Sequence, residues 1–171
     1  PLGFEERKGI MTEYLLRFGK KLDDSRLNLI SAAEPASNPL YLKILMDELR
    51  VTGTYEKLDE RLRDYLEAAD VPTLLQKVIN RYKKDYDRDR PGLAEDALTL
   101  LWAARRGLAE TELLELLRPY DLPKLPLAYW SPLRAAIEEM LVVRNGILNF
   151  SHDFIRSAVE KAFLSTPGSQ N

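Results

Sequence analysis

The chain has 171 residues, of which 45% are hydrophobic and 30% charged, and its formal net charge is -2. This composition is typical of a folded globular protein, and the charge gives no general attraction to nucleic acid or anionic membranes. Because there is no cysteine and one histidine, disulfides and thiolate zinc sites are excluded.

The N-terminal stretch PLGFEERKG begins without methionine and lacks the apolar segment of a signal peptide. No apolar run approaches the ~20 residues that a membrane-spanning helix needs. We therefore expect an excised fragment of a longer, cytoplasmic protein that has no membrane partner.

Apolar residues at helical spacing predict four helices with short links in the first 68 residues. We expect them over 4–22, over 26–33 with a stop near Pro35, over 37–50 and over 54–68. Asn38 is a good N-cap for the third helix, and Pro39 suits its first position, where a missing N–H costs nothing. This pattern predicts a four-helix bundle at 1–68.

The pattern restarts after Pro72 and changes period near the end of the chain. We expect helices over 73–86, 93–107, 108–119, 131–141 and 152–164, the fourth with Ser131 as its cap and Pro132 in its first turn. Asn145-Gly146 lies between two short apolar runs and predicts a two-residue β-hairpin. The last helix is expected to bury Phe154, Ile155, Ala158, Val159 and Phe163.

These elements predict a mainly α fold, a four-helix bundle followed by a winged-helix domain with a two-stranded β-hairpin. The expected domains are the bundle at 1–68 and the winged helix at 72–165, with 166–171 as a tail or linker. We find no internal repeat at the 30–45-residue periods of solenoid proteins.

Motifs for catalysis are absent. The only Gly-Lys pair, Gly19-Lys20, is followed by Lys21 and lacks the other residues of a phosphate-binding P-loop. KILMDE resembles a magnesium-binding strand, but its helical spacing places Asp47 and Glu48 on a solvated helix face. We therefore expect no enzyme and no metal site in this chain.

A winged helix also raises the alternative of a DNA-binding protein. The helix that would enter the major groove offers Arg134 against Glu138 and Glu139, and the hairpin adds only Arg144. Groove-reading helices need basic side chains that neutralise phosphate and polar side chains that read base edges. We expect no nucleic-acid partner.

His152, the sole histidine, begins the last predicted helix. It is either a partly buried side chain whose neighbours Ser151 or Asp153 cap the helix, or an imidazole that faces an anion held by another domain. The residues themselves leave both readings open.

The stretches NPLYLKILMDELR, GLAETELLELL and FSHDFIRSAV, in this order, resemble the helical and winged-helix modules of STAND-class (NACHT and NB-ARC) signalling ATPases. The similarity covers about residues 1–165, and the nephrocystin-like and telomerase-associated-protein-like NACHT proteins resemble the chain most. In that class a proline packs near adenine and a Met-His-Asp histidine contacts the β-phosphate of ADP. Pro39 matches the proline; His152 matches the histidine, although Ser151 replaces the methionine.

The resemblance implies a non-catalytic regulatory fragment of a nucleotide-dependent signalling switch. ADP or ATP would be bound in the intact protein by a P-loop domain upstream, which is the expected partner, with His152 and Pro39 as cofactor-binding residues. Oligomerisation or other protein partners are expected for the intact protein, and no cofactor for the isolated fragment. A plain protein-interaction module is a further alternative.

Overall fold

The computed structural model describes residues 1–165 and divides the chain into two compact units, Pro1–Lys77 and Val78–Asn171. The boundary falls inside α5 (Val71–Tyr86). The fold is mainly α-helical with one small sheet, which confirms the predicted class. The expected tail at 166–171 lies outside the described residues. Within residues 1–165, every helix is too short or too polar to span a bilayer.

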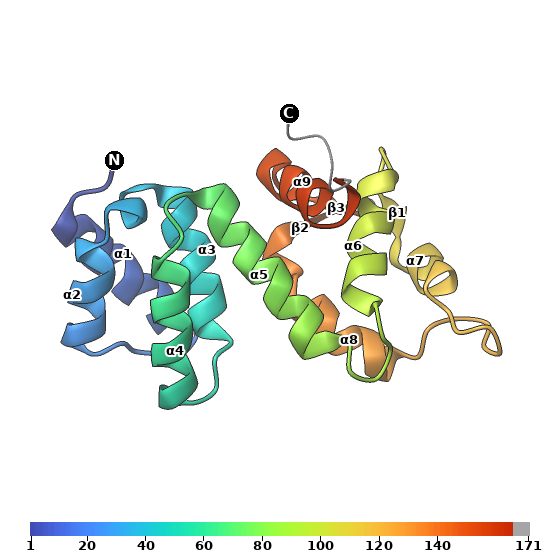
Figure 1. Cartoon of the computed structure of the whole chain (residues 1–171), viewed down its shortest axis with the longest axis horizontal. Helices are drawn as coiled ribbons and strands as arrows, with labels where there is room; N and C mark the ends of the chain where they lie inside the picture. The colour runs from blue at the N-terminus through green and yellow to red at the C-terminus, as the bar shows by residue number, and fades with distance from the viewer. Residues whose placement is uncertain (166–171) are drawn as a thin grey trace. The chain divides into compact units, whose positions relative to one another are not determined.

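The first unit is built from antiparallel helices joined by short loops (Figure 1). They are α1 (Phe4–Leu16), α2 (Asp24–Ala32), α3 (Pro39–Arg50) and α4 (Tyr55–Leu66), with a short 3₁₀ helix at Glu34–Ser37 before α3. The predicted start of α3 is confirmed, because Asn38 accepts hydrogen bonds from the amides of Leu40 at 2.9 Å and Tyr41 at 3.3 Å. Asp23 caps α2 in the same way, from the Arg26 amide at 2.8 Å.

Helix α1 ends six residues earlier than the predicted limit of 22. Gly19 has a left-handed φ of 65°, and two bonds close the turn around it: the Lys20 amide donates to the Leu15 carbonyl and the Gly19 amide to the Leu16 carbonyl. This is the Schellman arrangement, in which glycine ends a helix without a Cβ penalty. Leu22 is still buried, but from the loop rather than from the helix.

Buried polar contacts join α3 to the end of α4. The Tyr41 hydroxyl, which is fully buried, donates to the carbonyls of Tyr65 at 2.7 Å and Ala68 at 2.9 Å. The hydroxyl of Tyr65 in turn donates to Glu48 at 2.7 Å. Since unpaired buried carbonyls and carboxylates are costly, these contacts fix how α3 and α4 pack.

The predicted solvated position of Glu48 is therefore wrong. Glu48 is only 3% exposed. Its carboxylate accepts a hydrogen bond from the Tyr65 hydroxyl, which replaces the hydrogen bonds to water that burial removes. Asp47 is also largely covered, with a side chain 14% exposed that pairs with Lys43 at 2.8 Å and accepts a hydrogen bond from Tyr14. Helical spacing alone could not show which side of α3 its neighbours cover.

The second unit combines helices with a three-stranded antiparallel sheet of order β1-β3-β2. After α5 the elements are α6 (Leu93–Ala103), β1 (Leu108–Ala109), α7 (Glu110–Leu116), α8 (Leu127–Ala136), β2 (Leu141–Arg144), β3 (Ile147–Phe150) and α9 (Asp153–Val159), with short 3₁₀ and π turns at Glu138–Met140 and Glu160–Leu164.

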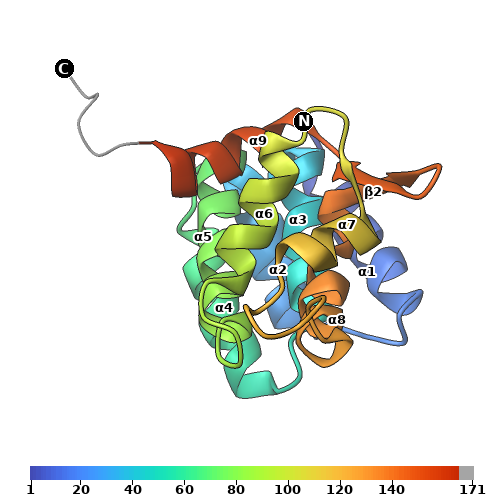
Figure 2. The same cartoon turned by 90° about the vertical axis from the view of Figure 1, so that its right-hand side faces the viewer.

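The Asn145-Gly146 hairpin is confirmed. Both turn residues have positive φ, 51° and 76°, as a type I′ turn requires, and Arg144 pairs with Ile147 at the base of the turn. In Figure 2 the tip of this hairpin points away from α9. The third strand, β1, was not predicted because it is only two residues long. It pairs with β3. Directly before β1, the backbone of Gly107 approaches β3 so closely that a Cβ there would lie 2.3 Å from the Leu148 carbonyl oxygen, so the position requires glycine.

Two helix predictions in the second unit are wrong. Helix α8 begins at Leu127, so Ser131 is not its cap and Pro132 lies inside it. The early start buries Trp130, whose indole N–H donates to Glu110 at 2.7 Å. In α9, Phe154 is 46% exposed rather than buried, because the buried side chains of that helix are on another face.

We predict that Tyr41→Phe lowers the free energy of unfolding by about 1–2 kcal/mol, since the buried hydroxyl no longer bonds to the carbonyls of Tyr65 and Ala68. Urea unfolding followed by circular dichroism measures it. The matched control is Tyr55→Phe, at a tyrosine that is 73% exposed, with an expected change below about 0.5 kcal/mol. Equal effects of the two substitutions would contradict the packing role of Tyr41.

The same contact predicts a pH dependence. Burial, with a smaller contribution from the charge of Asp70, raises the pKa of Tyr41 from 10.0 to about 12. Because the pKa is raised, folding favours the protonated Tyr41 hydroxyl. The contribution of Tyr41 to the free energy of unfolding is therefore complete below pH 10 and is lost as the pH rises toward 12. The stability difference between the wild type and Tyr41→Phe should therefore shrink over this range in urea unfolding. A difference that stays constant would refute the assignment.

Candidate functional site

Pro39, predicted to contact a nucleotide, is an exposed residue at the first position of α3 in the first unit. The Asn38 side chain already occupies the cap, and proline at this position sacrifices no helical hydrogen bond. The start of α3 accounts fully for the residue types at these two positions.

His152, the other predicted ligand-binding residue, is exposed and is itself the N-cap of α9 in the second unit. Its Nδ1 accepts a hydrogen bond from the Phe154 amide at 3.2 Å, and its ring stacks on Phe154 with centroids 5.0 Å apart. The expectation that Ser151 or Asp153 supplies the cap is therefore wrong.

The surroundings of His152 do not by themselves form a phosphate site. Its Nδ1 is engaged with the helix, which leaves one N–H donor, and the carboxylate of Asp153 is adjacent in sequence. The nearest cation along α9, Arg156, donates instead to the Trp102 carbonyl. His152 and Pro39 belong to different units, so ADP or ATP binding through this pair stays a prediction.

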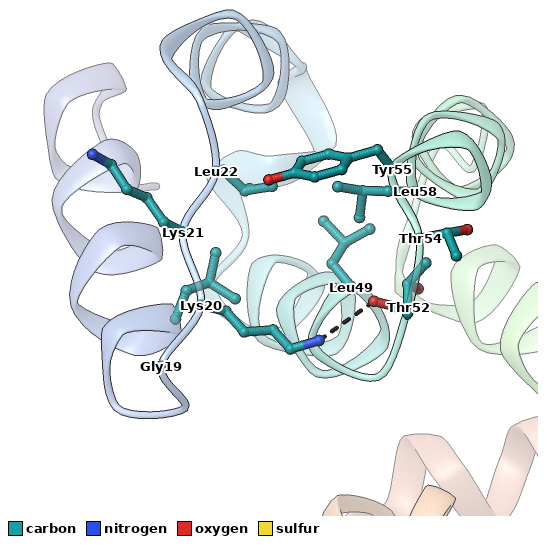
Figure 3. A pocket seen from close by; sticks show the side chains of 11 residues that line it. Gly19, Lys20, Lys21, Leu22, Leu49, Thr52, Thr54, Tyr55 and Leu58 are labelled. Carbon is teal, nitrogen blue, oxygen red and sulfur yellow. Dashed lines mark hydrogen bonds between the residues drawn. The ribbon is translucent and has the colours of Figure 1, made fainter.

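A pocket of about 390 Å³ in the first unit, here named the Lys20 pocket, is a stronger candidate for a binding site (Figure 3). Four buried leucines contribute to its lining, and the loops after α1 and α3 and the start of α4 supply the rest. The lining residues are Leu15, Gly19, Lys20, Lys21, Leu22, Leu49, Thr52, Gly53, Thr54, Tyr55 and Leu58.

Helix ends create this pocket. The left-handed turn at Gly19 ends α1, and the loop that follows leads to α2 at Asp24. Helix α3 ends at Arg50, and α4 begins only at Tyr55. The four leucines of the lining come from α1 (Leu15), the loop after it (Leu22), α3 (Leu49) and α4 (Leu58). Figure 3 shows the Tyr55 ring beside Leu22 and Leu58.

The edge of the pocket is cationic. Lys20 extends toward the loop after α3 and donates to the Thr52 carbonyl at 3.4 Å, a long hydrogen bond, whereas Lys21 points away from the cavity from the same loop (Figure 3). Beside the pocket, the guanidinium of Arg50 lies over the Phe18 ring at 4.4 Å. Within residues 1–165, no ion pair joins Lys20, Lys21 or Arg50 to an acidic side chain.

The pocket is connected to the buried contacts between α3 and α4. Thr52, whose carbonyl receives Lys20, donates its hydroxyl to the Glu48 carbonyl at 3.1 Å and accepts from Arg61 at 2.9 Å. Glu48 also holds the Tyr65 hydroxyl. The Thr52 side of the pocket therefore has a fixed shape, because buried hydrogen bonds determine its backbone.

Sequence reasoning missed this site. Gly19, Lys20 and Lys21 do not form a P-loop, but a glycine followed by two lysines directly after an apolar helical stripe indicates a helix end with a basic loop. Leu15 and Leu22 flank these residues, and the rest of the lining lies in one distant stretch, 49–58, which no sequence pattern connects to them.

Comparisons with known proteins relate nearly the whole chain to short parts of much longer proteins. It is 33% identical over 167 residues, 98% of the chain, to a TPR repeat-containing protein of Dictyostelium discoideum. It is 35% identical over 154 residues to tetratricopeptide repeat protein 41 of Mus musculus, and 31% identical over 134 residues to Telomerase protein component 1 of the same organism, with 78% and 76% of the chain covered.

The chain spans only 10%, 12% and 5% of the lengths of these three relatives. No family model matches the chain, and no solved structure matches it significantly. The names of the relatives overturn the assignment to STAND-class ATPases, and with it the predicted role as a fragment of a nucleotide-dependent switch. An upstream P-loop domain as the partner is likewise unsupported.

We predict that His152→Ala lowers the free energy of unfolding by about 0.5–1 kcal/mol through loss of the α9 cap. His152→Asn, which restores a side-chain acceptor at the cap, should recover most of that loss. Urea unfolding of the three proteins at neutral pH tests this. If alanine and asparagine were equally destabilising, the capping role of the imidazole would be refuted.

Proposed function

We propose that the chain is a non-catalytic protein-interaction module within a longer protein. The Lys20 pocket carries the proposal, because a cavity lined by four leucines, with lysines that have no acidic partner among the described residues, offers buried area and directed charge to another protein. Its volume of about 390 Å³ is within the range of about 300–1,000 Å³ that is usual for binding pockets.

The names of the relatives support a protein-interaction role. Tetratricopeptide repeats are helix–turn–helix units that stack into solenoids with extended concave binding surfaces. Two of the three relatives are named for such repeats. The present chain covers about a tenth of each of these two proteins, so what the whole proteins bind is part of the proposal rather than of the comparison.

We further propose the finer architecture, a four-helix bundle at 1–68 and a winged-helix domain at 72–165. The order α6–β1–α7–α8–β2–β3 supports the second part, with β1 between the first two helices and the β2–β3 hairpin as the wing. The antiparallel arrangement of α1 to α4 supports the first part.

DNA binding is not proposed. On α8, the helix that follows α7, Arg134 is engaged with Glu110 at 3.7 Å, and the following carboxylates Glu138 and Glu139 are exposed. These contacts leave this face of the unit without the positive charge that phosphate neutralisation requires.

A binding experiment tests the proposed function. The 171-residue chain, immobilised, is used to isolate proteins from cell extract, and each candidate is then purified and titrated against the chain by calorimetry. We expect at least one protein to bind directly and saturably, with a Kd on the order of 1–10 μM or lower. The control is the same chain unfolded by urea and coupled to the support.

Parallel assays measure ATP hydrolysis by the chain and its affinity for ADP. We expect neither turnover nor binding at a nucleotide concentration of about 1 mM. Hydrolysis of ATP by the chain, or the failure of every purified candidate protein to bind, would refute the role as a non-catalytic interaction module.

A further inference from the structure

We propose that the Lys20 pocket binds an acidic segment of a partner protein, with one large apolar side chain in the cavity and flanking carboxylates at Lys20, Lys21 and Arg50. This inference rests on the proposed function and adds the chemistry of the partner. The segment is short, since the cavity accommodates one or two side chains rather than a helix.

The cavity determines the apolar part of the ligand. Leu15, Leu22, Leu49 and Leu58 are each less than 10% exposed as residues, yet all four line the cavity. An entering leucine or phenylalanine would remove their remaining apolar surface from water, and burial of its own side chain would favour binding. Tyr55, which is 73% exposed, would cover the inserted side chain from above.

The charges determine the polar part. The residues that line the pocket include two lysines and no acidic residue. Lys20 has only a long contact to the Thr52 carbonyl, so a carboxylate could replace that contact at little cost. Arg50, whose guanidinium lies over the Phe18 ring beside the pocket, has no acidic partner among the described residues. A carboxylate at this edge of the pocket would add an ion pair there.

The arrangement favours a peptide over a long polyanion. Asp23 and Asp24 follow the lysines in the same loop region, and their charges would repel a nucleic acid that extends past the pocket. Nucleic acids require many phosphate contacts along a basic stripe, whereas the cations at this pocket are Lys20 and Lys21 in its lining and Arg50 beside it. A membrane surface does not fit well either, because the apolar side chains line a concavity instead of a protruding face.

The test uses fluorescein-labelled synthetic dodecapeptides and the full 171-residue chain, with fluorescence anisotropy as the readout. The acidic peptide has glutamates around a central leucine–phenylalanine pair. One control peptide has glutamine in place of every glutamate, and a second has serine in place of the apolar pair. We expect a Kd on the order of 10–100 μM for the acidic peptide at low salt, and at least about tenfold weaker binding of both controls.

Variants locate the site. Lys20→Glu combined with Lys21→Glu should weaken binding of the acidic peptide at least about tenfold, because attraction becomes repulsion. Lys124→Glu combined with Lys161→Glu is the matched control. Both of its lysines are exposed in the second unit, and the net charge changes by the same amount. Circular dichroism melting confirms that both variants fold, and in heteronuclear NMR the amides of Gly19, Thr52 and Gly53 should shift on peptide addition.

Three outcomes would overturn the inference: equal loss of binding in both double variants, no preference for the acidic peptide over its controls, or tighter binding to duplex DNA or phosphatidylserine vesicles than to the peptide. The proposed function is tested separately. A purified partner that binds the Lys20→Glu/Lys21→Glu variant as tightly as the unmodified chain would refute the pocket assignment and leave the interaction module intact. If no protein binds the chain, the proposed function itself fails.

Discussion

The position of helix α3 against α4 depends on a small set of buried polar contacts, and the Lys20 pocket depends on that position. Tyr41 donates to two carbonyls at the end of α4, and Tyr65 donates to Glu48. These groups are desolvated in the core, so each requires its partner, and the helices cannot slide without breaking hydrogen bonds that water does not replace. Apolar packing alone would tolerate several registers of two such helices.

The consequence for the surface is a preorganised pocket. Thr52 receives Lys20 from one loop and Arg61 from α4, and it is bonded to the helix turn that carries Glu48. Loops that bind a partner usually lose conformational entropy when they become ordered. A cavity whose edge is held in this way loses little of it on binding. The lysine side chains themselves remain exposed, so affinity for an acidic partner would depend on salt.

The two residues that suggested a nucleotide-dependent ATPase, Pro39 and His152, have a simpler physical explanation. Pro39 lies at the first position of α3, and His152 caps α9. Short motifs such as Asn-Pro-Leu and Ser-His-Asp occur where helices begin, because these residue types satisfy or avoid the free amides of the first turn. The resemblance to nucleotide-dependent ATPases was therefore built partly on helix starts, while the curated relatives are named for other features.

The sequence by itself determined the mainly α class, the start of α3 at Asn38 and the hairpin at Asn145-Gly146, because caps and tight turns depend on residues only a few positions apart. It did not determine the start of α8, the strand β1 or the burial of Glu48, which depend on partners 17 to 40 residues away along the chain: Glu110 for Trp130, Leu148 for Leu108 and Tyr65 for Glu48. The pocket was decided by tertiary structure for the same reason. Its walls come from two stretches of the chain, 15–22 and 49–58, whose side chains meet only after α1, α3 and α4 have packed.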